Sequence, residues 1–264
     1  MSAMRYTARM DLARSLATGA ALMTLIVAAR YFAVSGVFAA LTLHRHPKAG
    51  PAADKRPAQV RREILYSLLS AAIYGVPAGI VGALWQARGW TAIYDGVPHG
   101  FGAWLALPVS AFVFLFAHDT YFYWSHRWMH RPAVFARVHA VHHASRPPTA
   151  WAAMSFHWTE AASGAVVIPL LAFVIPIHLA ALMVVLTIMT WNGVTNHMGW
   201  EIYPRSWVAG WFGRHVITAS HHHLHHRHYR CNYGLYFRFW DRVCGTDKGW
   251  AAELLPDHAA VLTH

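Results

Sequence analysis

Long apolar stretches separated by short polar ones fill the first half of this chain. One runs from Ser15 to Leu43 and contains Arg30 as its one charged residue, and a second runs from Ile64 to Trp85. At the rise of an α-helix the second stretch covers about 33 Å, enough to cross the hydrocarbon core of a bilayer. The first stretch fits either one tilted span or a helix that breaks near Ser35 and re-enters the membrane, and the pattern leaves both open.

Two further apolar stretches follow in the middle of the chain. Gly102 to Phe116 is a third predicted span, and it continues without a helix breaker into a histidine-rich segment. Ala161 to Asn192 is long for one span and short for two, with Pro169 and Pro176 inside it. Prolines inside a helix kink or end it, so this stretch predicts a kinked hairpin that returns the chain to the same side of the membrane.

The polar segments between and after these stretches predict a helical cap. A helix is expected from Ala133 to His143, and an amphipathic segment from Trp200 to Gly213. The basic linker 44–63 is expected in the cytoplasm, because cytoplasmic loops carry an excess of Lys and Arg. The predicted fold class is therefore all-α: an integral membrane helical bundle with about four membrane-embedded helical segments and a cytoplasmic histidine-rich cap, which we expect in a bacterial inner membrane.

Composition agrees with a membrane protein and argues against a nucleic-acid-binding one. Hydrophobic residues make up 56% of the chain and charged residues 12%, and the mean hydropathy is +0.28. The net charge of +11 comes from basic residues that flank apolar spans, whereas a nucleic-acid-binding protein gathers them on one soluble face. Cys231 and Cys244 show no metal or redox spacing and are expected to be free thiols.

Histidines recur in three groups at helical spacing. His126 and His130 are four residues apart, and the two remaining groups both have the pattern HxxHH. Residues three and four apart share one face of a helix, so each group projects its imidazoles together. The second group is His139, His142 and His143, and the third is His222, His225 and His226.

Eight imidazoles are more than a single tetrahedral zinc site uses, and they suit two metals that share a nitrogen-rich shell. Iron, zinc and copper all accept imidazole ligands. Haem needs only two axial histidines and would leave most of the set unexplained. A purely hydrogen-bonding role fits one histidine better than three groups with this spacing.

Other polar residues are weaker candidates. His197, after an apolar helix, is a ninth possible ligand, and His118, about two helical turns before His126, has a supporting role. His157 and Glu160 either orient ligands, as outer carboxylates do, or simply cap a helix. His44 and His46 lie in a Pro- and Lys-containing loop and are expected to be solvated.

The histidine groups and their surroundings resemble the fatty acid hydroxylase/sterol desaturase superfamily. The resemblance rests on HDTYFYWSHRWMH, HAVHH, PTAWAAMSFHWTE, NHMG, HHLHHRHYRCNYG and FWDRVCGTD, in this order, and covers about residues 60–247. PTAWAAMSFH is similar to sterol C5-desaturases, and the last motif with its tail is similar to the whole superfamily, sterol hydroxylases included. The resemblance implies a catalytic domain at 61–247, after an N-terminal membrane helix and linker (1–60) and before a C-terminal tail (248–264).

The resemblance implies a membrane enzyme that uses two iron ions, dioxygen and two electrons to hydroxylate or desaturate a C–H bond of a sterol, fatty acyl chain or related lipid. Zinc can replace iron in such sites in a purified sample. The implied ligands are the eight grouped histidines together with His197. Supporting contacts, or a further ligand, are expected from His118, Asp119, His157, Glu160, Asn196, Asn232 and Asp241.

Electrons would come from an external donor, because the chain has no nucleotide-binding GxGxxG motif. We expect a ferredoxin or a cytochrome b5-like protein with an NAD(P)H reductase. A basic rim would dock this donor or anionic lipid head groups; it consists of Arg127, Arg131, Arg137, Arg146, Arg227 and Arg230. Two other classes stay open: a histidine-rich metal transporter, and a non-catalytic membrane protein stabilised by metal.

Overall fold

The computed structural model describes residues 3–45 and 56–255, and nearly all of its regular structure is helical. Helix α1 is unbroken from Ala3 to Arg45, so the alternative of a break near Ser35 is wrong. Helix α2, Arg56–Arg88, begins before Ile64 and takes up part of the predicted linker. His46 lies outside the described residues, and His44 is exposed as expected.

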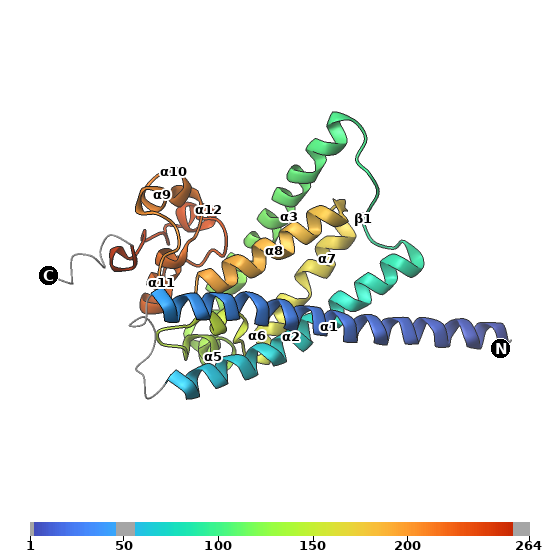
Figure 1. The fold of residues 1–264 in the computed structure, drawn as a ribbon, viewed down its shortest axis with the longest axis horizontal. Coiled ribbons are helices and arrows are strands. Elements are labelled where there is room, and N and C mark those ends of the chain that lie inside the picture. The colour runs from blue at the N-terminus through green and yellow to red at the C-terminus, as the bar shows by residue number, and fades with distance from the viewer. Residues whose placement is uncertain (1–2, 46–55, 256–264) are drawn as a thin grey trace.

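Helices α1 and α2 lie side by side along most of their lengths (Figure 1). Glycines permit the close approach, since a Cβ added to Gly19 would stand 2.7 Å from the carbonyl oxygen of Gly79. Small residues at such crossings allow the backbones of membrane helices to pack closely. Further along the two helices, Tyr31 on α1 and Ser67 on α2 both donate hydrogen bonds to the carbonyl oxygen of Trp151. These bonds connect the helix pair to the cap.

Helix α3, Gly100–Met129, passes from the third apolar stretch into the first histidine group without interruption, as the sequence predicts. Within residues 3–45 and 56–255, three helical segments are long and apolar enough to cross a membrane: Asp11–His44, Pro57–Arg88 and Gly100–Met129. The all-α membrane bundle predicted from the sequence is confirmed in these helices.

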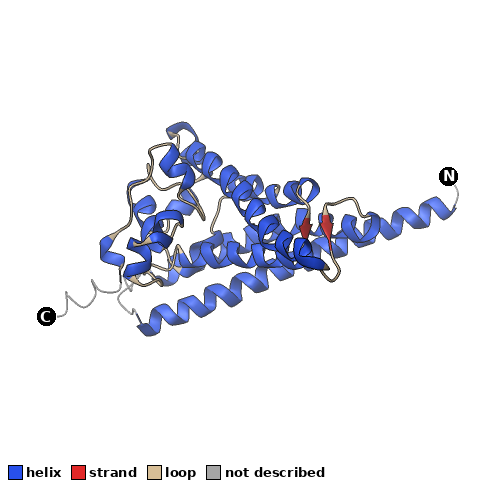
Figure 2. Cartoon of the chain, turned by 90° about the horizontal axis from the view of Figure 1, so that it is seen from above, coloured by secondary structure: helices blue, strands red, loops and turns tan. Residues whose placement is uncertain are grey.

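The fourth apolar stretch forms the predicted hairpin. It contains α6 (Trp158–Ala165), α7 (Val167–Val174) and α8 (Leu179–Thr195), with the turn between α7 and α8. Strand β2, Ile177–His178, lies at this turn and pairs in parallel with β1, Ile93–Tyr94, and Figure 2 shows the two short strands in red. Helix α8 brings the chain back to the end of the bundle where α3 finishes (Figure 1).

A cap of short helices covers that end. It is built from α4 (Pro132–Val138), α5 (Ala140–His143), η1 (Ala150–Met154), α9 (Arg205–Ala209), α10 (Trp211–His215), α11 (Ala219–His228), α12 (Phe239–Val243) and η2 (Ala252–Leu254). Two predicted segments are each divided. The helix expected from Ala133 to His143 is interrupted at His139, and the amphipathic segment divides at Gly210.

Candidate metal centre

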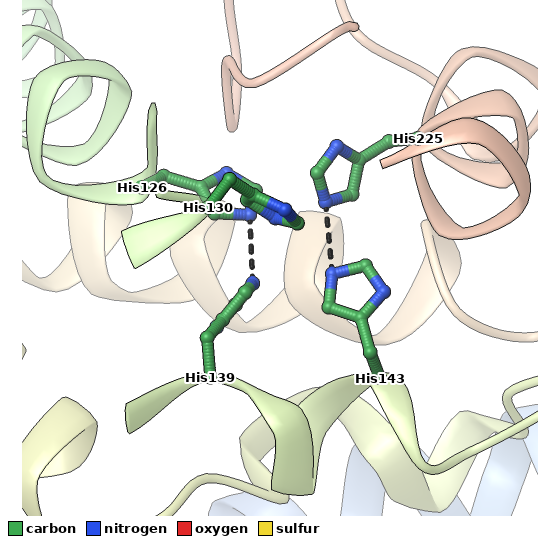
Figure 3. A group of neighbouring side chains, drawn as sticks. All are labelled: His126, His130, His139, His143 and His225. Atoms are coloured by element: carbon green, nitrogen blue, oxygen red, sulfur yellow. Dashed lines mark hydrogen bonds between the residues drawn. The ribbon is translucent and has the colours of Figure 1, made fainter. Parts of the chain in front are cut away.

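Nine histidines meet in the cap and form two clusters. We define the first cluster as His126, His130, His139, His143 and His225, and the second as His142, His197, His222 and His226. Within each cluster the candidate ligand nitrogens all lie within 4.8 Å of one another. Figure 3 shows the first cluster, with rings from α3, from the segment around α5 and from α11 pointing toward a common centre. All nine side chains are buried except that of His130, which is half-buried.

Helical spacing explains how few elements supply so many rings. His126 lies on the last turn of α3 and His130 caps the C-terminal end of that helix, with ring centroids separated by 5.0 Å. On α5, the neighbours His142 and His143 diverge, their ring planes inclined at 88°, so each joins a different cluster. Helix α11 serves both clusters, because His225 joins the first while the rest of its HxxHH group joins the second.

Backbone carbonyls fix the orientation of three rings. The Nδ1 atom of His126 lies 2.8 Å from the Tyr233 oxygen, that of His225 lies 2.8 Å from the Cys231 oxygen, and that of His197 lies 2.6 Å from the Gly193 oxygen. A carbonyl oxygen only accepts, so Nδ1 carries the proton in each of these rings. The Nε2 atom of each neutral ring therefore presents a lone pair to the centre of its cluster.

The Nε2 atoms face one another at distances that suit a shared cation. They are 3.0 Å apart between His126 and His139, and 3.1 Å apart between His143 and His225. In the second cluster, His197 Nε2 lies 3.0 Å from His222 and 3.2 Å from His142. One ring proton cannot satisfy several converging lone pairs, whereas one metal ion accepts them all, so the residues present fit a metal ion in each cluster.

Burial keeps the clustered rings in the form that binds metal. It lowers the pKa of His142, His222 and His225 well below the ordinary value, and lowers the pKa of His130 to about 2. Metal ions compete with protons for imidazole nitrogen, so a ring with a low pKa stays neutral and available.

Glu160 is the one predicted supporting residue that touches a clustered histidine. Its Oε1 atom lies 2.8 Å from Nδ1 of His139, and it stands in the first turn of α6. Burial raises the pKa of Glu160 and lowers the pKa of His139, so without a cation the contact is a neutral pair. A metal ion on the opposite nitrogen would favour the charged carboxylate.

Two aspartates fix the segment that follows the third histidine group. Asp241 accepts hydrogen bonds from the backbone amides of Tyr233 and Gly234, at 2.9 and 2.8 Å. Asp119, on α3, accepts from the amides of Leu235 and Tyr236, at 3.0 and 2.8 Å. Since the Tyr233 carbonyl orients His126, these carboxylates support a cluster ring that neither of them touches.

The remaining predicted supporting residues lie one step further out. Asn232 donates to the carbonyl oxygens of His221 and Gly249, and Asn196 donates to that of Leu235. His118 bonds to the hydroxyl of Tyr236, and His157 to that of Thr159. Among the described residues, none of these four hydrogen-bonds to a clustered ring; the two asparagines brace the backbone, and the two histidines bond to hydroxyl groups.

Comparison with known proteins places the chain in a family. The family model described as "Fatty acid hydroxylase" matches residues 111–246, which include all nine clustered histidines. The chain belongs to the fatty acid hydroxylase family. No solved structure matches the chain significantly.

Several curated relatives of this family member are named for sterol oxidation. The chain is 31% identical to "Lathosterol oxidase" of Mus musculus over 191 residues, covering 72% of this chain and 62% of that one. It is 31% identical to "Delta(7)-sterol 5(6)-desaturase ERG3B" of Gibberella zeae over 180 residues, covering 67% and 53%. The chain thus spans less than two thirds of the length of these two relatives.

Sequence reasoning missed two buried glutamates of this fatty acid hydroxylase family member. Glu201 accepts hydrogen bonds from the Thr218 hydroxyl at 2.6 Å and from the amide and hydroxyl of Ser220 at 3.0 and 2.9 Å, so it fastens the start of α11. Glu63, on α2, accepts from Gln59 and Thr149. A lone acid among mostly apolar neighbours was the available signal for Glu201, whereas Glu63 directly follows Arg61 and Arg62 and carries no such signal.

Tyr229 was also missed. It ends α11 with a left-handed backbone, φ 66°, and its ring centroid lies 4.6 Å from that of His143 and 6.1 Å from that of His130. Its hydroxyl accepts a hydrogen bond from Arg146, whose Nε also donates to the carbonyl oxygen of His143. Tyr229 therefore lies between the first cluster and the cap surface.

The six arginines of the predicted basic rim have different surroundings. Arg227 pairs with Glu253 at 2.8 Å, and Arg127 is half-buried, donates to Tyr123 and stacks on Trp124. Arg131, Arg137 and Arg230 are exposed and have no ion-pair partner among the described residues. The free positive charge of the rim is thus greatest around α4 and the end of α11.

Proposed function

We propose that this protein is a membrane-bound di-iron oxidoreductase that hydroxylates or desaturates an unactivated C–H bond of a sterol or related lipid. The observation that carries the proposal is the pair of imidazole clusters, each with converging lone pairs, in a member of the fatty acid hydroxylase family. The names of the relatives support a sterol as the first substrate class to test.

The nine clustered histidines would hold the two ions, with five rings on one and four on the other. Iron held there would supply oxidation of the C–H bond by dioxygen and two electrons, chemistry that no side chain performs. The protein would hold the imidazoles at fixed angles. The groups that do so are the backbone carbonyls of Tyr233, Cys231 and Gly193 and the carboxyl group of Glu160.

The position of the clusters suits a lipid substrate. They lie where α3 leaves its apolar segment, so a lipid carbon would reach them from the membrane without crossing water. In a metal transporter, the histidines would line a path through the bilayer. Here they gather at one end of the three candidate spans, as Figure 1 shows for α5 and α11 at the end of α3.

Two electrons per turnover would come from a separate protein at the cap. The exposed arginines Arg131, Arg137 and Arg230 favour an acidic donor such as a ferredoxin or a cytochrome b5-like protein. We further propose that the cap faces the cytoplasm, because basic residues at the start of α2 lie at the same end of the bundle: Arg62 donates to the carbonyl oxygen of Ala144, next to α5.

The direct test compares lipid extracts of cells that express the full chain with cells that express His142→Ala or His225→Ala. We expect a lipid that gains one oxygen or loses two hydrogens only with the unsubstituted chain. His228→Ala is the matched control, because His228 is exposed on α11 and belongs to neither cluster.

The proposal fails if the lipid profiles are identical at equal protein levels. A gain of oxygen would assign hydroxylation and a loss of hydrogen would assign desaturation, since both reactions begin with removal of the same kind of hydrogen atom. Metal flux into proteoliposomes without a lipid product would instead favour transport.

A further inference from the structure

The two histidine clusters differ in how firmly their rings are held. We propose that the first cluster binds its metal ion more tightly than the second, and that Glu160 is the positioning residue that sets most of the difference. The proposal rests on the proposed function only in requiring that both clusters hold a metal ion.

Ligand number is the first difference. The first cluster offers five imidazoles and the second offers four. Each added nitrogen contributes another bond to the same ion, so the first cluster starts with the larger set.

Ring orientation is the second difference. In the first cluster His126, His139 and His225 each have a hydrogen-bond partner on Nδ1, while His143 Nδ1 is buried without one. In the second cluster His197 has such a partner, whereas the Nδ1 atoms of His222 and His226 are buried without one. An unpartnered ring can rotate about its Cβ–Cγ bond, and holding it on a metal costs that freedom.

The kind of acceptor is the third difference. Glu160 is the one carboxylate that contacts a clustered ring among the described residues, and its partner His139 belongs to the first cluster. Its second oxygen, Oε2, is buried and has no hydrogen-bond partner, so the carboxylate has no competing donor. A carboxylate on Nδ1 makes the opposite nitrogen a better ligand, and losing such a partner usually costs 10–100-fold in metal affinity.

Accessibility alone predicts the opposite order of metal loss. His130, in the first cluster, is half-buried, whereas every histidine of the second cluster is buried. A chelator that removed the more exposed ion would therefore empty the first cluster first. Equilibrium measurements separate the two explanations, because affinity and not access decides the final occupancy.

The test uses purified full-length protein loaded with Zn²⁺ and dialysed to equilibrium against buffers of graded free Zn²⁺. Bound metal per protein is measured by mass spectrometry of the metal. We expect two release steps whose midpoints differ by about 10–100-fold in free Zn²⁺. The step at higher free Zn²⁺ belongs to the second cluster, and His142→Ala should move it to a still higher concentration. The step at lower free Zn²⁺ belongs to the first cluster, and His130→Ala should move that one upward.

Glu160→Gln tests the positioning residue. It should raise the free Zn²⁺ concentration at which the first cluster releases its ion by about 10–100-fold. The concentration at which the second cluster releases its ion should stay unchanged. Glu201→Gln is the matched control, since Glu201 is also a buried glutamate but fastens the backbone of α11, which serves both clusters. Glu201→Gln should move both steps together, and a thermal melt of each variant measures any loss of folding.

The inference is overturned if the unsubstituted protein loses both ions in one step, or if Glu160→Gln moves both steps equally. It is also overturned if His130→Ala shifts the release step at higher free Zn²⁺, because the first cluster would then be the one that binds its ion more weakly. A protein that binds no Zn²⁺ under any condition would overturn the proposed function itself, and lipid turnover with a single release step would leave that function standing while removing this inference.

Discussion

His143 and His225 are 82 residues apart in the sequence, yet their Nε2 atoms lie 3.1 Å apart in the first cluster. The contact depends on the α6–α8 hairpin, which carries the chain into the apolar bundle and back before α11 begins. Substituting either ring would therefore remove a proposed ligand and also a long-range contact between two parts of the cap.

Removal of His225 should weaken metal binding in the first cluster. At a free metal concentration that just fills this cluster in the unsubstituted chain, we expect His225→Ala to hold about one ion less per protein and to lower lipid turnover by more than about 100-fold, because one of the five imidazoles is lost. Metal analysis and lipid mass spectrometry check the result. Equal metal content in His225→Ala and His228→Ala would contradict it.

Asp241 should contribute to stability through its two backbone hydrogen bonds. Asp241→Ala leaves the buried amides of Tyr233 and Gly234 without their acceptor, which should lower the free energy of unfolding by about 2–4 kcal/mol. Denaturant unfolding in detergent measures the loss. Asp95→Ala, at an exposed position, is the control and should change the value by less than about 0.5 kcal/mol.

Stability of the metal-free protein should fall as the solution becomes acidic. Burial lowers the pKa of His197 to about 4 and of His221 to about 3, from 6.5. Below pH 6.5 the unfolded chain binds protons that the folded chain does not, so acid favours unfolding. We expect the free energy of unfolding to decline as the pH falls from 6.5 through about 4, measured by denaturant titration after chelation. A value that rises over this interval would contradict the prediction.

Charge reversal near α4 and at the end of α11 should impair electron delivery without impairing the metal centre. We expect Arg137→Glu with Arg230→Glu to raise the KM for an acidic protein donor by about tenfold or more, through lost electrostatic attraction. Activity driven by a small chemical reductant should stay unchanged. The control is Arg205→Glu with Arg214→Glu, two exposed positions on α9 and α10.

The arginine prediction has a clear alternative outcome. If both double variants raise the KM equally, the effect belongs to overall charge. If neither changes the KM but the first weakens binding to vesicles that contain anionic lipid, the exposed arginines contact the membrane instead of a donor.

Much of this architecture was predictable because its signals are local. Apolar length identified the three candidate spans, and spacings of three and four residues identified the histidine groups on helices. Other features depend on contacts between distant segments. Neither the divergence of His142 and His143 into different clusters nor the role of Glu201 at the start of α11 follows from spacing. The domain boundaries and ligand roles stay predictions.

The structure departs from the predicted cap at two residues that spacing alone does not single out. His139 ends α4 and precedes α5, and its Nδ1 lies 2.8 Å from Glu160. Gly210 separates α9 from α10 within the segment expected to be amphipathic. The spacing of residues 133–143 predicts one helix, whereas tertiary contacts also decide where helices end.

Helix α11 contributes to both clusters and follows the other six clustered histidines in the sequence. During synthesis those six are made before it, so neither cluster could be assembled until α11 had left the ribosome. A nascent chain stopped before residue 219 would therefore lack part of both clusters at once.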